Sequence, residues 1–213
     1  MFYSKENSKV FRLGDIVKNF LTIVPIMKNA ATDIKGLNCE IRLYYSYHAI
    51  LTPCCSIEQG FIMLAPLEKV RPGLFKNKYT LKNLTIINKK MPESYVYKDS
   101  EWAELSLEAQ EEIIAKSDDY QYYDFFVFAE HDSLPPYPLK LGPGEKVETR
   151  FYLVDFRKAF RVKCDKIQRI EEPDKLPPES ELLSFVREVK LLELSESARV
   201  DFKGKLAHFY IRD

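Results

Sequence analysis

Three residues in one short stretch, His48 and the adjacent pair Cys54 and Cys55, have side chains that often act in catalysis and metal binding. A thiol becomes a nucleophile when a nearby base lowers its pKa, and His48 precedes the pair by six residues. As metal ligands, the cysteines need further donors, for which Cys39 and His48 are the nearest, but the usual two-residue gap is missing. A free cysteine also behaves as a small buried hydrophobe. This structural interpretation is favoured, and we expect no metal and no cofactor.

The segments that would position these residues have the composition of β-strands. Residues 12–27 are rich in Ile, Val and Phe after a Gly14–Asp15 turn, with a helix as the alternative. Residues 40–52 form a second expected strand, which ends at Pro53 because proline donates no ladder hydrogen bond. A turn at residues 58–60 leads to a third strand over residues 61–67.

Bulk composition indicates a globular chain without a global electrostatic preference. The 213 residues are 46% hydrophobic, and 32 basic side chains balance 32 acidic ones, so no net field attracts nucleic acid or membranes. The four cysteines follow no disulfide framework, the N-terminus lacks the apolar core of a signal peptide, and residues 20–27 are too short to span a bilayer. We expect a cytoplasmic protein with reduced thiols, no membrane contact and a frayed, polar segment at residues 1–9.

Local charge is uneven along the middle of the chain. Residues 68–90 hold seven basic side chains against one acid, interleaved with aromatic residues, a pattern that suits a phosphate backbone and stacked bases. The candidate nucleic-acid-binding residues are Lys69, Arg71, Lys76, Lys78, Tyr79 and Lys82. The alternative is a solvated loop and edge strand guarded by lysines, which is the more common origin of such a run.

The segment that follows is acidic and has helical periodicity. Residues 93–119 carry nine acids against two lysines, and apolar residues recur every three or four positions from Trp102 to Ile113. This pattern predicts an amphipathic helix over about 101–117, with Ser106 as its cap. Such a helix could fold onto the basic stretch and neutralise it.

The C-terminal part is predicted to contain further strands and then two helices. Strands are expected within residues 120–131 and 149–164, on either side of a proline-rich turn at residues 133–146. Ser195 lies where an N-cap would divide the helical run that follows. The second helix has an apolar stripe whose members are candidate interface residues: Phe202, Leu206, Phe209 and Tyr210. Docking on the chain's own core is the default, and contact with a partner or a second copy is the alternative.

Three segments, in this order, resemble the MazF/PemK-like toxin superfamily: LGDIV at residues 13–17, HAILTPCCSI at 48–57 and GFIMLAPL at 60–67. The resemblance implies a small SH3-like β-barrel, which is often dimeric in that family, and many members cut single-stranded RNA. It covers about residues 12–70. Residues 190–213 also resemble the end of a group of uncharacterised prokaryotic proteins, many of them encoded in defence or stress operons.

The resemblance includes a departure at the catalytic position. In the family, an arginine directly before a proline acts in RNA cleavage, and these two positions fall at Ser46 and Tyr47 here. A hydroxyl does not replace a guanidinium that stabilises developing charge on a phosphoryl group. Arg42, on the same strand face by the period of two, is the candidate substitute, and His48 is the candidate general base. The candidate catalytic residues are therefore Arg42, Ser46, His48 and Thr52.

Together these observations predict an α+β fold: an SH3-like (MazF/PemK-like) β-barrel with a lateral acidic helix and a C-terminal helical pair. Residues 1–135 would form the barrel core with the inserted helix, and residues 136–213 would add strands and the C-terminal helices that pack on the barrel.

The predicted function is that of a MazF/PemK-like module in a prokaryotic toxin or antiviral-defence system, catalytically altered and acting by binding. Its partner would be a protein from the same operon, RNA or both, and homodimerisation is a further candidate. The alternative is an active, metal-independent endoribonuclease of the mRNA interferase type.

Overall fold

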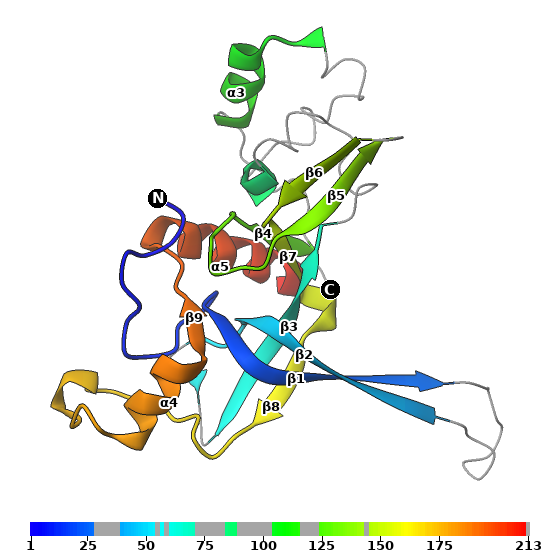
Figure 1. Cartoon of the computed structure of the whole chain (residues 1–213). Coiled ribbons are helices and arrows are strands. Elements are labelled where there is room, and N and C mark those ends of the chain that lie inside the picture. The colour runs from blue at the N-terminus through cyan, green and yellow to red at the C-terminus, as the bar shows by residue number, and fades with distance from the viewer. Residues whose placement is uncertain are drawn as a thin grey trace.

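The structure is a computed structural model of the chain. It describes residues 1–27, 39–53, 56–57, 60–70, 84–88, 104–115, 124–142 and 145–211. These residues form a mixed α+β fold, in which a curled antiparallel sheet packs against helices (Figure 1), so the expected α+β class is confirmed.

Strands make up more of the described part of the chain than helices do. The strands are β1 (Ile16–Met27), β2 (Cys39–Ile50), β3 (Phe61–Lys69), β4 (Phe125–Phe128), β5 (Tyr137–Gly142), β6 (Glu145–Thr149), β7 (Tyr152–Asp155), β8 (Phe160–Lys163) and β9 (Lys190–Leu192). The helices are α3 (Leu107–Ala115), α4 (Glu181–Val189) and α5 (Glu196–Ile211), with 3-10 turns η4 (Leu84–Asn88), η6 (Phe156–Lys158) and η7 (Pro173–Lys175). The three strands expected near the N-terminus are confirmed as β1, β2 and β3, and the helical alternative for β1 is wrong.

The main sheet has seven strands in the order β4-β7-β3-β2-β1-β9, with β8 also paired to β3. β2 and β3 pair as the sequence predicts, with Ile50 opposite Leu64. β3 bonds β7 and β8 as well, and these two strands are separated by η6. Strands from the two expected parts of the chain, residues 1–135 and 136–213, therefore share one sheet.

The β1–β2 hairpin extends beyond this sheet as a projecting ribbon (Figure 1). β9 pairs with β1 only at Ile16 and Val17, and β3 pairs with β2 only from His48 to Ile50. A bulge lies between Val17 and Phe20, where Asn19 has a left-handed backbone with φ 68°. We call residues 20–27 and 39–47 the arm.

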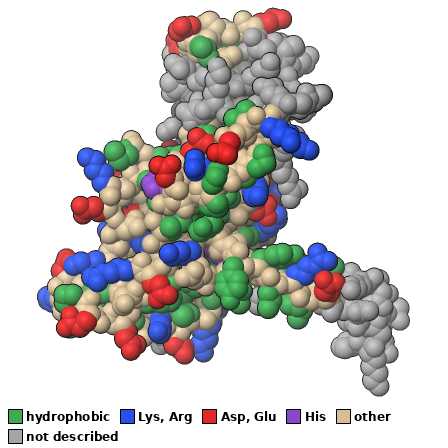
Figure 2. Space-filling model, viewed as in Figure 1, with side chains coloured by type: hydrophobic (Ala, Val, Ile, Leu, Met, Phe, Trp, Pro, Cys, Tyr) green, Lys and Arg blue, Asp and Glu red, His purple; other side chains and the backbone are tan. Residues whose placement is uncertain are grey.

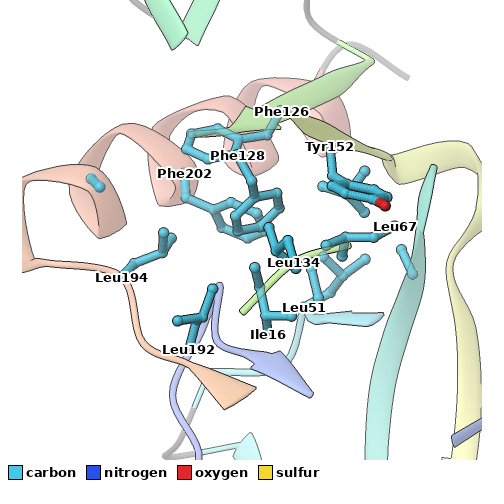
Figure 3. Packing of buried hydrophobic residues seen from close by; sticks show 14 of the residues in the cluster. Ile16, Leu51, Leu67, Phe126, Phe128, Leu134, Tyr152, Leu192, Leu194 and Phe202 are labelled. Carbon is cyan, nitrogen blue, oxygen red and sulfur yellow. The ribbon is translucent and has the colours of Figure 1, made fainter. Parts of the chain in front are cut away.

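The main core lies between the sheet and α5 (Figure 3). Phe202 of α5 is fully buried, with its ring centroid 4.9 Å from that of Phe126 and 5.6 Å from that of Phe156. Edge-to-face aromatic pairs of this kind add to the burial energy. The stripe predicted on the last helix therefore anchors α5 to the sheet.

The expected helical pair is confirmed as α4 and α5, and Ser195 Oγ accepts a hydrogen bond from Ala198 N at 3.3 Å at the start of α5. The short strand β9 between them was not expected. The acidic helix is present as α3, which begins at Leu107, and Ser106 Oγ accepts a hydrogen bond from Ala109 N at 3.2 Å. Figure 1 shows α3 and α4 at opposite ends of the molecule.

The polar N-terminal segment is held in place, so the expectation that residues 1–9 are frayed is wrong. Tyr3 is 7% exposed and forms a β-bridge with Leu194. The amide of Ser4 donates to the carbonyl of Glu193 at 2.8 Å. The sequence gives no sign of these contacts, because their partners lie about 190 residues away. No helix among the described residues is long and apolar enough to cross a membrane.

Candidate functional site

Three of the side chains able to do chemistry meet where the arm leaves the sheet. Thr22 Oγ1 lies 2.7 Å from His48 Nε2 and 2.8 Å from Ser46 Oγ, and Ser46 Oγ lies 3.2 Å from the same imidazole nitrogen. The antiparallel register, with Phe20 opposite Ser46, puts Thr22 on the same face of the ribbon as Ser46 and His48. Ser46 and His48 were predicted candidates, whereas Thr22 was not.

His48 is enclosed at this position. Its residue is 0% exposed, and the rings of Phe20 and Phe160 lie edge-on to it at 6.3 and 5.4 Å. Burial lowers the pKa of His48 to about 4, because an imidazolium is poorly solvated there. The imidazole is therefore neutral at neutral pH.

The hydrogen bonds of His48 determine what its ring can do. Within the described part of the chain, Nδ1 is buried without a hydrogen-bond partner. Nε2 lies within hydrogen-bond distance of the threonine and serine hydroxyls, and it donates or accepts there according to which ring nitrogen carries the proton. A general base that acts through Nε2 needs its Nδ1–H to be held by an acceptor, and no described group does this for His48.

Arg42 is not brought to this cluster. It lies six positions before His48 on β2, a separation of about 20 Å at about 3.3 Å per strand residue. Its side chain is 52% exposed, and its Nε donates to Glu40 at 2.8 Å. That bond to Glu40 raises the pKa of Arg42. Arg42 and His48 therefore do not share one site in this structure.

Thr52 has a structural position. Its Oγ1 accepts a hydrogen bond from Met63 N at 2.7 Å, and the residue is 8% exposed. This hydrogen bond joins the end of β2 to β3. Thr52 is thus separate from the cluster around His48.

The arm exposes an apolar face along its length, which the sequence analysis missed. Leu21 lies opposite Tyr45, so both point to the side away from Thr22 and Ser46. The exposed residues on this face, with their exposed fractions, are Leu21 (39%), Ile41 (65%), Leu43 (58%) and Tyr45 (81%). Figure 2 shows hydrophobic side chains gathered on the arm. The alternation of apolar residues along β2 indicates a buried face, but nothing in the sequence says that the described part of the chain leaves it uncovered.

The predicted nucleic-acid-binding residues fall mostly outside the described residues. This holds for Arg71, Lys76, Lys78, Tyr79 and Lys82, and also for the cysteine pair at 54–55. Lys69 is described: it is exposed at the end of β3, and its Nζ lies 5.4 Å from the centroid of the Tyr137 ring. Among the described residues, no group of three or more His, Cys, Asp or Glu side chains is placed to hold a metal ion.

The four candidate interface residues on α5 divide into two kinds. Phe202 and Leu206 are 0% and 7% exposed and belong to the chain's own core. Phe209 is half-buried, with its ring 5.7 Å from that of Phe156. Tyr210 is 52% exposed. The helix docks mainly on its own sheet, and Tyr210 is the member of this set that is open to solvent.

A buried ionic network joins the two ends of the chain. Lys190 Nζ lies 2.7 Å from Asp15 Oδ2 and 2.6 Å from Glu193 Oε2, and Arg199 Nη2 lies 3.1 Å from Glu193 Oε1. Burial raises the pKa of Asp15 to about 7. Burial also opposes ionisation of Glu193, but hydrogen bonds from Lys190 and Ser8 outweigh it and hold the pKa at about 2. The sequence does not reveal this network, since Asp15 and Lys190 are distant along the chain.

Comparison with protein-family models, with curated proteins and with solved structures finds no match for this chain. The function must therefore be argued from the arm, the His48 cluster and the charged groups described above.

Proposed function

We propose that this chain is a protein-binding module that contacts its partner through the apolar face of the arm. In this proposal it is a catalytically altered MazF/PemK-like protein with an SH3-like barrel, acting in a prokaryotic toxin or antiviral-defence system. A protein encoded in the same operon is the proposed partner, with RNA as a further ligand on the basic stretch.

The observation that carries the proposal is the exposure of Leu21, Ile41, Leu43 and Tyr45 on one face. Three of the four side chains are more than half exposed, so this face leaves a mostly apolar surface in water. The largest apolar patches on ordinary monomers reach about 300–600 Å² and are often functional. A two-stranded ribbon is marginally stable by itself, so a partner that covers this face would also stabilise the arm.

The edges of the arm offer a second means of contact. In the arm, residues 39–47 of β2 and residues 20–27 of β1 pair only with each other among the described strands. Unpaired strand edges present backbone N–H and C=O groups that another chain can bond. Apolar side chains and open edges on one ribbon suit a partner that adds a strand.

The geometry of the candidate catalytic residues supports binding rather than cleavage. His48 is enclosed, its Nδ1 has no hydrogen-bond partner among the described residues, and Arg42 lies about 20 Å along the strand. A substrate phosphate cannot contact all of these groups at once.

The test of binding uses a photo-crosslinking amino acid at Leu43, in the cells that naturally make the protein. A matched probe replaces Val200, which is 64% exposed on α5 and lies outside the arm. We expect a discrete crosslinked species from position 43 that is lost when Tyr45→Ser is added, and none from position 200. A species of twice the chain mass identifies a second copy, and any other mass identifies a different protein. Equal crosslinking from both positions, or none from position 43, contradicts the proposal.

The endoribonuclease alternative is tested separately. The purified chain is incubated with a mixed RNA pool without metal, beside Arg42→Ala and His48→Ala. We expect the RNA to remain intact in all three samples. Site-specific cuts by the unmodified chain that vanish in either variant would establish the alternative.

A further inference from the structure

A groove of about 780 Å³ runs along one face of α5, away from the arm. The helix contributes residues at spacings of three and four from Arg199 to Tyr210, which form a single face. The opposite walls come from residues 10–13, from the turn after β2 and from residues 168–171. A volume of this size matches the pockets that enclose small organic ligands.

The walls of the groove are largely apolar. Phe11, Leu51 and Ile57 line the groove and are each at most 4% exposed, so they are fixed in the core beneath it. Leu206 and Ala207 extend this surface along α5, and the half-exposed Tyr210 lies at its end. These side chains suit a ligand with a flat or aliphatic body.

The charged groups of the groove are mainly cationic. Among the described residues that line it, Arg12, Arg169, Arg199 and Lys203 face one carboxylate, that of Glu171. Arg169 Nη2 lies 3.6 Å from Glu171 Oε1, so the positive and negative charges of these two residues offset each other. Lys203 is exposed and has no ion pair among the described residues. The groove thus holds unbalanced positive charge beside apolar walls.

The buried network holds two of these cations in place. Glu193 Oε1 lies 3.1 Å from Arg199 Nη2 and 3.5 Å from Arg12 Nη1. Arg199 also donates from Nε to the carbonyl of Leu13 and from Nη2 to that of Leu194. The two carboxylates of the network, Asp15 and Glu193, face the cations Lys190, Arg199 and Arg12, so a positive surplus remains. Arginines fixed in this way lose little conformational freedom when an anion binds.

We propose that this groove is a binding site for a small organic anion, with a phosphate or carboxylate group near Arg12, Arg199 and Lys203 and an apolar body along α5. Phosphate and carboxylate ligands of this kind share an anionic head group on a flat or aliphatic body. The proposal does not depend on the function assigned to the arm, because the two sites share no residue.

The first test uses 8-anilinonaphthalene-1-sulfonate, a fluorescent aromatic sulfonate, titrated into the full chain and followed by fluorescence and calorimetry. We expect one saturable site and at least a tenfold weaker affinity in Arg12→Ala and in Lys203→Glu. The control variant Lys146→Ala changes an exposed lysine on β6, outside the groove, and should bind as the unmodified chain does. The Leu43→Ser/Tyr45→Ser variant, which changes the apolar face of the arm, should bind the dye as the unmodified chain does, and this result would exclude the arm as the dye site. Thermal unfolding of each variant excludes dye binding to unfolded chains.

The second test asks which head group and body the groove accepts, by displacement of the dye. Adenosine monophosphate and decanoate represent the phosphate and carboxylate sources, and adenosine and decanol are their uncharged counterparts. Displacement by either anion, with little effect of its uncharged counterpart, supports the proposal and identifies the source. It is overturned if neither anion displaces the dye, if charged and uncharged compounds compete equally, or if Lys203→Glu binds the dye with unchanged affinity.

Discussion

Lys190 Nζ lies between the carboxylates of Asp15 and Glu193, and its side chain is 2% exposed. It also donates to the carbonyl of Val10 at 2.7 Å. One ammonium group thus joins β9 to the start of β1 and to the N-terminal segment. Removal of one partner from a buried ion pair is strongly destabilising, because the remaining charge has no compensation.

Lys190→Met should lower the free energy of unfolding by about 3–5 kcal/mol, as measured by urea denaturation at neutral pH. Lys9→Met is the matched control, because Lys9 pairs with Asp174 at 2.8 Å on the surface, where the side chains are 47% and 87% exposed. That variant should change stability by less than about 1 kcal/mol. Equal effects in the two variants would mean that the buried network contributes no more than a surface pair.

His48 predicts a pH dependence of stability. Its folded pKa, about 4, lies below the usual 6.5, so between these values the unfolded chain binds more protons than the folded one. Stability due to this group is therefore full above about pH 6.5 and declines as the pH falls toward 4, by at most about 1.4 kcal/mol per pH unit. His48→Gln should lack this slope, so the difference in unfolding free energy between the unmodified chain and the variant should decline as the pH falls from 6.5 toward 4. Parallel curves from pH 4 to 7 would show that His48 is accessible and titrates normally.

The sequence predicts which side chains lie together when they share one strand, because the strand period determines their spacing. It does not predict neighbours that come from different strands. Ser46 and His48 are two residues apart on one strand, and the structure brings them together as the period requires. Thr22 completes their cluster from another strand, and its position depends on a register that one sequence does not specify. The same period puts Arg42 on that face, but the six positions between Arg42 and His48 along β2 hold the two side chains apart.

β3 and α5 each join several elements of this fold. β3 pairs with three other strands, and α5 places its buried stripe against the aromatic residues of β4 and η6. Apolar periodicity is sufficient to predict both elements. It does not predict β9, because Lys190–Leu192 continues the apolar pattern of the helix that precedes it. The arm was also missed, since a strand pattern does not reveal where pairing with the rest of the sheet stops.

Phe202→Ala tests whether α5 belongs to the core. Loss of a fully buried phenyl ring that contacts Phe126 and Phe156 should destabilise the fold by about 3–5 kcal/mol in chemical denaturation. Tyr210→Ala on the same helix is the comparison, and its half-exposed side chain should contribute less than about 1 kcal/mol. Similar losses from both variants would contradict the assignment of Phe202 to the core and Tyr210 to the surface.

The molecule combines a body, in which a curled sheet packs against helices, with the projecting arm (Figure 1). The body is stabilised by the aromatic core and by the network that links its two ends. The arm carries the exposed apolar face and the unpaired strand edges, on the far side of the bulge at Asn19. This division predicts that the arm can lose its apolar side chains without loss of the fold.

Ile41→Ser/Tyr45→Ser should therefore abolish the partner species crosslinked from position 43, while it changes the free energy of unfolding by less than about 1 kcal/mol. Val200→Ser, an exposed apolar residue on α5, should affect neither property. A loss of stability as large as that of Phe202→Ala would instead make the arm part of the fold of the single chain.

Amide hydrogen exchange along the arm tests the central claim most directly. The exchange rates of residues 20–27 and 39–47 are compared between the isolated chain and the complex purified from the cells that make it. Outward-facing amides on these two edges should exchange quickly in the isolated chain and at least tenfold more slowly in the complex, while those of β3 and α5 stay unchanged. Equal exchange of the arm in both samples, with slower exchange elsewhere, would contradict the claim that the arm is where this protein binds its partner.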